Sequence, residues 1–256
     1  MPRLIVTLAI PTIFTMLITA VYNMADTFFV ARLGTSAAGA VGIVFAIMAV
    51  IQSLGFMIGM GSGSLVSRAL GERRKEAADE FASTAFAMAV GAGMLLAATG
   101  LIFTEELMIL LGATPTILPY AMDYAHYIFF GTPFMCCSFV MNNLLRAEGK
   151  PVFATIAIGS GGLLNIALDP LFIFGFGLGI SGAAIATLIS QCVGFSILLY
   201  FFLSGRNITK LSFRNFIEIH KYCHKWSLSI GCHKRDHLIL DHLNTTVDLL
   251  FDTHLS

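Results

Sequence analysis

The chain has little charge for its length. Only 12% of its 256 residues are Asp, Glu, Lys or Arg, and the 15 basic side chains balance the 15 acidic ones. A net charge of zero gives no sign of nucleic-acid binding, which normally needs a basic excess. Hydrophobic residues make up 57% of the chain, and the mean hydropathy is +0.83. A soluble domain of this length is rarely so apolar, so the composition indicates a membrane protein.

Cysteine is sparse as well, and its spacing excludes the common metal-binding frameworks. The five cysteines contain no C-x-x-C pair. Three of them lie in apolar runs, where cysteine usually packs as a small hydrophobic residue. The pairs Cys223-His224 and Cys232-His233 match no standard zinc finger, so we predict no metal centre there. No cleavable signal peptide is expected, because the first apolar run is too long and lacks a small-residue cleavage site.

Six apolar runs have the length needed to cross a bilayer, which is about 20 residues for a helix. They cover about residues 7–31, 40–66, 82–103, 120–145, 152–174 and 180–203. The second run holds Gly55, Gly59, Gly61 and Gly63, for which we predict close helix packing rather than phosphate binding. The expected fold is an all-α membrane protein with a bundle of six transmembrane helices.

The connections between these runs differ in charge. Those on one side carry ten basic residues and those on the other carry only Arg32. The ten are Arg3, Arg68, Arg73, Arg74, Lys75, Arg146, Lys150, Arg206, Lys210 and Arg214. Because basic connections stay in the cytoplasm, both termini are predicted to be cytoplasmic, and the chain to be a multi-pass protein of the plasma (inner) membrane.

One carboxylate lies within the fifth apolar run. A charge inside a membrane helix costs roughly 2.5–3.5 kcal/mol, so Asp169 is expected to face a cavity or a partner. Asn165 lies one helical turn before it and shares its face. Pro170 has no N–H and leaves the Ile166 carbonyl without its usual donor. A carboxylate, an amide and a free carbonyl suit a small hard cation or a proton, although a buried carboxylate can also simply tie helices together.

Depth in the membrane groups further polar residues with Asp169. Given the predicted orientation, Asp26, Asp169 and Thr187 lie about five to seven residues from the outer ends of three different spans. At ~1.5 Å per residue this places them ~7–11 Å from the outer surface. The coincidence favours a site in the outer half of the bundle.

The first span carries its own polar face. Thr19, Tyr22, Asn23 and Asp26 follow the i, i+3, i+4, i+7 spacing of one helix side. Pro11 lies in the same helix and is either a hinge or a static kink. Tyr124, near the outer end of the fourth span, either lines the same cavity or belongs to the aromatic belt common at that level.

Several of these runs resemble the multidrug and toxic compound extrusion (MATE) transporters. Ala9-Ile10-Pro11 through Tyr22-Asn23-Met24-Ala25-Asp26-Thr27 is similar to their first helix. The segment 165–191, with Asp169-Pro170-Leu171-Phe172 and Gly179-Ile180-Ser181-Gly182-Ala183-Ala184, is similar to their fifth and sixth helices. Leu145-Arg146-Ala147-Glu148-Gly149-Lys150-Pro151 resembles the connection between the fourth and fifth. The resemblance covers about residues 1–216.

This resemblance implies a secondary antiporter rather than an enzyme. Such proteins expel organic cations or related drugs in exchange for Na⁺ or H⁺, need no other cofactor, and have twelve helices in two six-helix lobes. By the resemblance, Asp26, Asn165, Asp169 and Thr187 match the cation-binding positions. Tyr22 and Tyr124 match neighbouring cavity positions. Thr19 and Asn23, which share the polar face of Tyr22, are expected to line the same cavity and meet the drug. Pro11 matches the proline linked to bending of the first helix.

The sequence departs from the family after residue 216. Segment 217–256 holds six of the seven histidines and the only tryptophan, Trp226, and has no apolar run of membrane length. We therefore expect a six-helix unit over residues 1–216, followed by an atypical, disordered cytoplasmic tail that a shifted reading frame would explain. A chain with one lobe is expected not to transport alone, since alternating access needs two bundles. A homodimer or a missing second lobe would supply the other.

Three other functions compete with efflux. A lipid-linked flippase of the same broad fold would need a more basic cavity. A non-functional remnant of a broken transporter gene would explain the tail. An intramembrane aspartyl protease would pair two aspartates, but Ala25 precedes Asp26 and Leu168 precedes Asp169, which does not match the Tyr-Asp and Gly-x-Gly-Asp motifs that such proteases resemble.

Overall fold

The computed structural model describes the main chain of residues 2–204 and 207–209, with the side chains of residues 10, 13–204 and 207–209. All regular elements in these residues are helical. They are α1 (Pro2–Ala31), α2 (Thr35–Gly71), α3 (Lys75–Ile102), α4 (Thr104–Leu110), α5 (Leu118–Ala147), α6 (Pro151–Pro170), the short π-helix η1 (Leu171–Gly175) and α7 (Gly179–Leu203). The predicted tail, 217–256, lies outside the described residues.

The predicted six-helix membrane bundle is confirmed for this part of the chain. Six helices are long and apolar enough to cross a bilayer, and each coincides with one predicted span. The seven-residue helix α4 is too short to cross and lies between α3 and α5. The family-level expectation of an all-helical membrane fold therefore holds.

Local sequence sets the end of the fourth span and the start of the fifth. Gly149 has φ 78°, a left-handed conformation that favours glycine and stops α5. The Lys150 N–H donates to the Leu145 carbonyl at 2.9 Å, and the Gly149 N–H donates to the Arg146 carbonyl at 3.0 Å. Pro151 then opens α6, where its missing N–H costs nothing. A three-residue connection, Glu148 to Lys150, is enough to reverse the chain direction.

Helices α2 and α3 extend furthest beyond the spans predicted for them. The second span was expected at 40–66, but α2 runs over 37 residues from Thr35 to Gly71. The third was expected to begin at 82, but α3 begins at Lys75. The hydrocarbon layer limits only the apolar stretch, whereas a helix continues as far as its residues allow. The basic connection is thus a tight turn at Arg73, with φ 58°.

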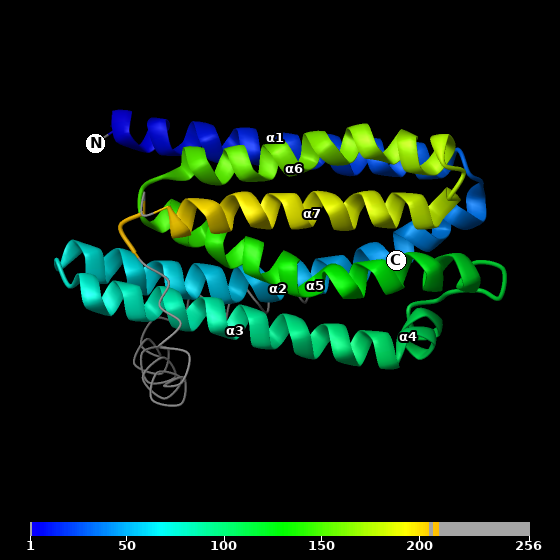
Figure 1. Ribbon diagram of the computed structural model, residues 1–256, viewed down its shortest axis with the longest axis horizontal. Helices are drawn as coiled ribbons and strands as arrows, with labels where there is room; N and C mark the ends of the chain where they lie inside the picture. The colour runs from blue at the N-terminus through cyan, green and yellow to red at the C-terminus, as the bar shows by residue number, and fades with distance from the viewer. Residues whose placement is uncertain (1, 205–206, 210–256) are drawn as a thin grey trace, which may run out of the picture. The chain divides into compact units, whose positions relative to one another are not determined.

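Helix α5 lies at the centre of the bundle. It packs against α2 and α3 on one side and against α7 on the other. Helix α6 packs between α1 and α7, so that α1 and α6 run side by side in Figure 1. Two-thirds of the apolar window of α5 is buried (67%), against 17% for α1. The most polar of the six spans is therefore the one most enclosed by the others.

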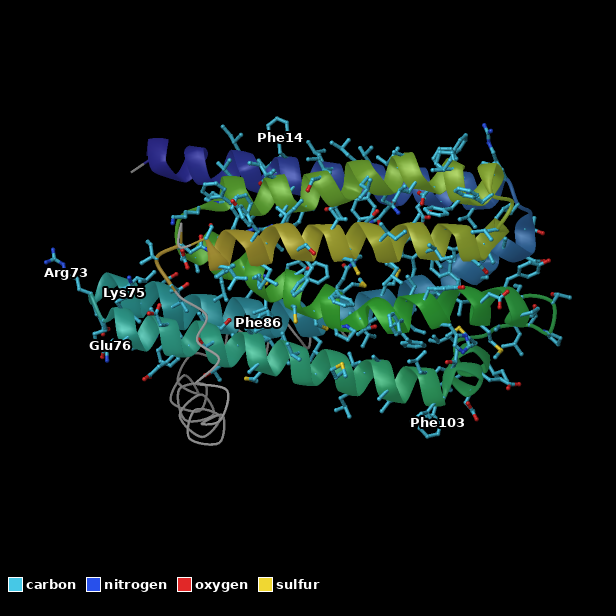
Figure 2. The ribbon with its side chains drawn as sticks, in the orientation of Figure 1. Phe14, Arg73, Lys75, Glu76, Phe86 and Phe103 are labelled. Atoms are coloured by element: carbon cyan, nitrogen blue, oxygen red, sulfur yellow. The ribbon has the colours of Figure 1, made fainter. Side chains whose placement is uncertain are left out.

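The outward faces are apolar and the charges gather at helix ends. Phe14 and Phe103 point away from the bundle in Figure 2 and are 56% and 53% exposed. Arg73, Lys75 and Glu76 lie together where α2 meets α3. Such a distribution suits a bilayer, in which lipid tails cover the middle of the bundle and water covers its ends.

Glycines bring α2 against α5, as the sequence predicted for Gly55 and Gly59. A Cβ added at Gly55 would lie 2.8 Å from Cβ of Phe139, and one at Gly59 would lie 2.8 Å from Nδ2 of Asn143. The helices approach closely because these positions carry no side chain. The close contact fixes α5, and with it the polar groups that α5 contributes to the interior.

Candidate functional site

Polar side chains from four helices meet in the interior of the bundle. Asp26 comes from α1, Tyr124 from α5, Asn165 and Asp169 from α6, and Thr187 from α7. All five are buried, and Asp169 has no exposed surface at all. Helices far apart in the sequence thus enclose two carboxyl groups in an apolar surrounding, where an isolated charge is costly.

Hydrogen bonds link these side chains into two arms. One arm is Tyr124 with Asp26, and the other is Asn165 with Asp169 and Thr187. The Tyr124 hydroxyl donates to Oδ2 of Asp26 at 3.4 Å. The Asn165 amide donates to Oδ1 of Asp169 at 3.2 Å and to Oγ1 of Thr187 at 3.3 Å. All of these distances are at the long end for hydrogen bonds, so a small shift would break them.

Each arm leaves an acceptor oxygen without a partner. Oδ1 of Asp26, Oδ1 of Asn165 and Oδ2 of Asp169 are buried and accept no hydrogen bond. Neither aspartate forms an ion pair with a basic side chain in the described part of the chain. Buried acceptors are nearly always satisfied. The site therefore fits a small cation or a proton, which would satisfy these oxygens and reduce the repulsion between two carboxylates.

The chain path around Asp169 is unusual. Pro170 ends α6, and the five residues of η1 follow as a π-helix, a rare element that is frequent at functional sites. The Leu178 N–H donates to the Phe172 carbonyl at 3.2 Å and closes the connection onto α7. A proline directly after the carboxylate thus sets both where α6 ends and the direction in which the chain runs back into α7.

A pocket of 390 Å³, mainly apolar but with many polar side chains in its lining, lies beside this cluster. It is lined by residues of α1, α2, α5, α6 and α7, among them Thr15, Thr19, Tyr22, Asn23, Gln52, Ser138, Asn142, Arg146, Asn165, Thr187, Ser190 and Gln191. Asn165 and Thr187 belong to both the cluster and the pocket. Asp26, Asp169 and Tyr124 do not line the pocket. The two carboxyl groups are therefore separated from the pocket by a wall that includes one amide and one hydroxyl.

The structure separates residues that the sequence analysis had put together. Thr19, Tyr22 and Asn23 line the pocket as cavity residues would. Tyr124, with 1% of its surface exposed, lies instead against Asp26, in neither the pocket nor an aromatic belt. Pro11 lies within the continuous helix α1, but its side chain is outside the described set, and its hinge role stays a prediction.

Sequence reasoning missed most of the residues that line the pocket. Ser138, Asn142 and Arg146 follow each other at one-turn spacing on α5, and Gln52 comes from α2. The hydroxyls of Ser138 and Ser190 are buried and without a hydrogen-bond partner. Polar residues inside the apolar spans were the available signal. A neutral polar side chain costs less free energy inside a membrane than a carboxylate does, so these positions were less conspicuous in the sequence.

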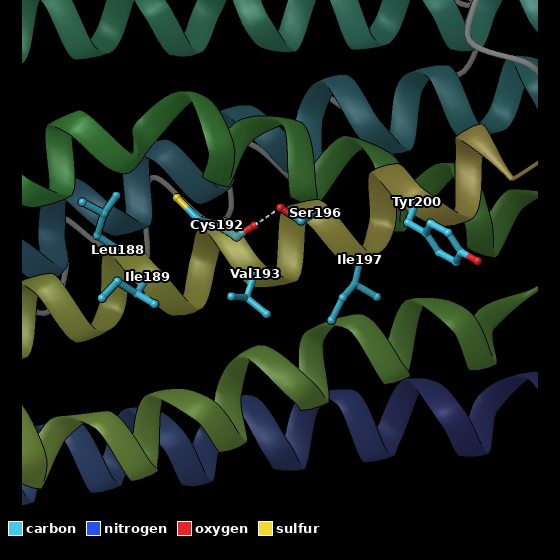
Figure 3. A pocket seen from close by; sticks show the side chains of 7 residues that line it. All are labelled: Leu188, Ile189, Cys192, Val193, Ser196, Ile197 and Tyr200. Carbon is cyan, nitrogen blue, oxygen red and sulfur yellow. Dashed lines mark hydrogen bonds between the residues drawn. The ribbon is translucent and has the colours of Figure 1, made fainter.

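A second cavity is apolar and lies along one face of α7. It has a volume of 530 Å³ and is lined by Leu188, Ile189, Cys192, Val193, Ser196, Ile197 and Tyr200. In Figure 3 the Ser196 hydroxyl donates to the Cys192 carbonyl of its own helix, at 2.7 Å. Because the Ser196 hydroxyl already donates its hydrogen bond within α7, this groove offers few groups that could bind a polar ligand.

Comparison with known proteins places these features in a family context. The family model described as MatE matches residues 11–171. A curated relative named "FAD transporter" from Shewanella oneidensis is 34% identical over 199 residues, covering 76% of this chain and 44% of the relative. "Multidrug export protein MepA" from Staphylococcus haemolyticus is 32% identical over 207 residues, covering 80% and 45%.

Solved structures agree. A structure titled "Crystal structure of MATE in the bent conformation" superposes with a TM-score of 0.79 at 33% identity, covering 83% of this chain and 48% of that one. An outward-facing multidrug resistance MATE transporter gives 0.80 at 33% identity, covering 86% and 49%. The chain spans about half the length of the relatives it matches.

Proposed function

Because the chain belongs to the MatE family, we propose that it serves multidrug efflux across the plasma membrane by antiport with Na⁺ or H⁺. The observation that carries the proposal is the set of three unpartnered buried oxygens on Asp26, Asn165 and Asp169. They lie next to a pocket large enough for a small organic molecule and share Asn165 and Thr187 with it. No covalent chemistry is involved, and the chain acts as a transporter component rather than an enzyme.

In this mechanism the cation and the drug compete through shared residues. A cation at Asp26 and Asp169 draws the oxygens of Asn165 and Thr187 toward it. Since the same side chains form part of the pocket wall, their movement changes the pocket that the drug needs. Pro11 would let α1 bend as the wall moves, as the family resemblance implies. The cation enters as the drug leaves, and a ligand with unequal affinity for two states shifts their populations.

The first expected result is thermodynamic coupling between cation and drug. Binding of ethidium to the purified chain should weaken at least about fivefold when Na⁺ is added, or when the pH is lowered if H⁺ is the coupling ion, since coupled sites typically differ by this much or more. Fluorescence polarisation of the dye gives the affinity. Choline chloride at the same ionic strength is the control.

Coupling between two binding sites is reciprocal, so the effect of ethidium on cation binding can be measured as well. Ethidium must weaken Na⁺ or H⁺ binding by the same factor as the cation weakens ethidium binding. Ethidium affinity that stays constant across Na⁺ and pH series would contradict antiport at this site, because no exchange is possible without competition.

A second substrate class is supported by one residue. Arg146 lines the pocket and forms no ion pair within the described residues. A guanidinium binds phosphate or carboxylate groups through paired hydrogen bonds, and one relative is named as a FAD transporter. FAD is therefore the second ligand in the same titration. Displacement of ethidium by FAD that disappears in Arg146→Gln would favour export of an anionic dinucleotide.

The orientation in the membrane is part of the proposal. The ten-to-one distribution of basic residues supports cytoplasmic termini. On that basis the Arg73 turn is cytoplasmic, while α4 and the connection from η1 to α7 face outward. The outer connection includes Phe176, which is 64% exposed.

Cysteine accessibility is expected to report this orientation. On a background without native cysteines, Glu106→Cys and Phe176→Cys should react with a membrane-impermeant thiol reagent in intact cells. Arg74→Cys should react only after permeabilisation. All three positions are exposed, so burial does not account for a difference. Phe176 is a better position than Gly177, whose φ of 67° strains any other residue. The opposite labelling pattern would reverse the topology.

We further propose that the pocket faces a second six-helix bundle. Gln52, Asn23 and Gln191 line the pocket at membrane depth, and polar side chains there usually face protein or water rather than lipid. A second copy of this chain, or a partner of similar kind, would cover them. The mass from size-exclusion chromatography with light scattering distinguishes a homodimer of this chain from a monomer that needs a different partner.

A further inference from the structure

Gly182, near the start of α7, lies directly against the main chain of η1. A Cβ added at this position would be 2.7 Å from both C and O of Phe172 and 3.0 Å from N of Ile173. The atoms it would meet belong to the backbone, which cannot rotate aside as a side chain can. Gly182 is buried. The close approach of two backbones therefore depends on the absence of a side chain here.

The same peptide group is held from a second side. The Phe172 carbonyl accepts the N–H of Leu178 at 3.2 Å. Phe172 thus lies between the turn that precedes α7 and the first helical turn of α7. The two contacts hold η1 against the start of α7.

This contact is close in sequence to both sides of the cation site. Phe172 follows Asp169 by three residues, with Pro170 between them, and Gly182 precedes Thr187 by five. Proline fixes its own φ and stiffens the link, so a displacement of η1 passes to Asp169. The Asn165 amide bridges Asp169 and Thr187 at 3.2 and 3.3 Å. It cannot keep both partners if α6 and α7 separate.

Other glycines between α6 and α7 are less constrained. A Cβ at Gly194 would lie 3.5 Å from the Ala157 carbonyl oxygen, an ordinary van der Waals contact. Gly194 belongs to the same helix as Gly182 but faces α6 rather than η1. It lines the pocket and lies two helical turns beyond Thr187, away from η1. It therefore serves as a matched control for adding one methyl group to this interface.

We propose that Gly182 is a positioning residue of the cation site. By holding η1 against α7 it sets the spacing between Asp169, Asn165 and Thr187, and hence the cation affinity. The inference rests on the proposed function, because it assigns the cation to that cluster. It adds to the cluster a residue with no polar side chain and no contact with the ion.

The test follows the reactivity of Asp169 in the purified chain of residues 1–256. Dicyclohexylcarbodiimide modifies protonated buried carboxyl groups, and mass spectrometry locates the product. Labelling of Asp169 is measured over a pH series and over a Na⁺ series for wild type, Gly182→Ala and Gly194→Ala. In Gly182→Ala the pH profile should move by about one unit, or the Na⁺ concentration for half-protection should change by about tenfold. Gly194→Ala should match wild type.

A gentler variant covers the case in which Gly182→Ala does not fold, as judged by circular dichroism. Leu178→Pro removes the second anchor of the Phe172 carbonyl, at a residue with φ −77° that proline can adopt. It should change the same profile by a smaller factor, about two- to fivefold, as expected for one hydrogen bond. A wild-type profile in both Leu178→Pro and any folded Gly182→Ala overturns the inference.

The outcomes separate the inference from the function it rests on. If neither Na⁺ nor pH affects labelling of wild-type Asp169, the cation proposal fails, and the labelling rates of the variants still show whether Gly182 positions Asp169. If wild type responds and Gly182→Ala responds identically, the positioning role is wrong. Equal changes in Gly182→Ala and Gly194→Ala would also overturn it, because the effect would then be general loosening of the interface.

Discussion

Replacing Asp169 with asparagine is expected to abolish cation binding while leaving the bundle intact. The carboxamide has nearly the volume of the carboxyl group and can still accept a hydrogen bond from Asn165. It removes the charge that attracts Na⁺ and the group that a proton would occupy. Asp169 is fully buried, and one of its oxygens has no partner. It is the carboxylate of the arm that also contains Asn165 and Thr187, so no other group of that arm can replace its charge. The loss should be at least about 100-fold, or about 2.7 kcal/mol.

The measurement is binding of radioactive sodium by equilibrium dialysis, together with ethidium affinity over a pH series. If H⁺ is the coupling ion, Asp169→Asn resembles the proton-loaded state, and ethidium affinity should become independent of pH at its low-affinity value. Asp123→Asn is the matched control, because Asp123 lies exposed on α5. Cation binding that survives in Asp169→Asn with wild-type affinity would remove Asp169 from the site.

The second large effect is expected when a bulky side chain fills the pocket. Thr19 lines the 390 Å³ pocket from α1, and tryptophan at this position would occupy much of the space that a drug needs. Ethidium affinity should fall by at least about tenfold. Cation binding should stay within about twofold of wild type, since Thr19 contributes no atom to the carboxyl cluster.

Val21→Trp is the control for this change. Val21 lies two residues away on the same helix, with 58% of its surface exposed, and does not line the pocket. The same indole therefore enters the lipid-facing side of α1. Equal ethidium affinity in both tryptophan variants would show that the dye binds elsewhere. A loss of cation binding in Thr19→Trp would show that the pocket and the cluster are one site.

The sequence alone determined the elements of this protein. Burial of apolar side chains in lipid is a local property of about 20 residues, so the six spans could be predicted without any knowledge of packing. Helical spacing is local as well. It placed Asn165 and Asp169 on one face, and Thr19, Tyr22 and Asn23 on another. Charge in the connections gave relative depth, which grouped Asp26, Asp169 and Thr187 at one level of the membrane.

Only the tertiary structure decided which of these groups meet. Azimuthal rotation of each helix, and the choice of neighbours around α5, depend on side-chain packing between segments far apart in sequence. That packing pairs Tyr124 with Asp26 and Asn165 with Thr187, and it leaves both carboxyl groups outside the pocket. It also gives Gly182 its importance. The closeness of two backbones follows from how α7 returns along η1, and the spacing of polar residues carries no trace of it.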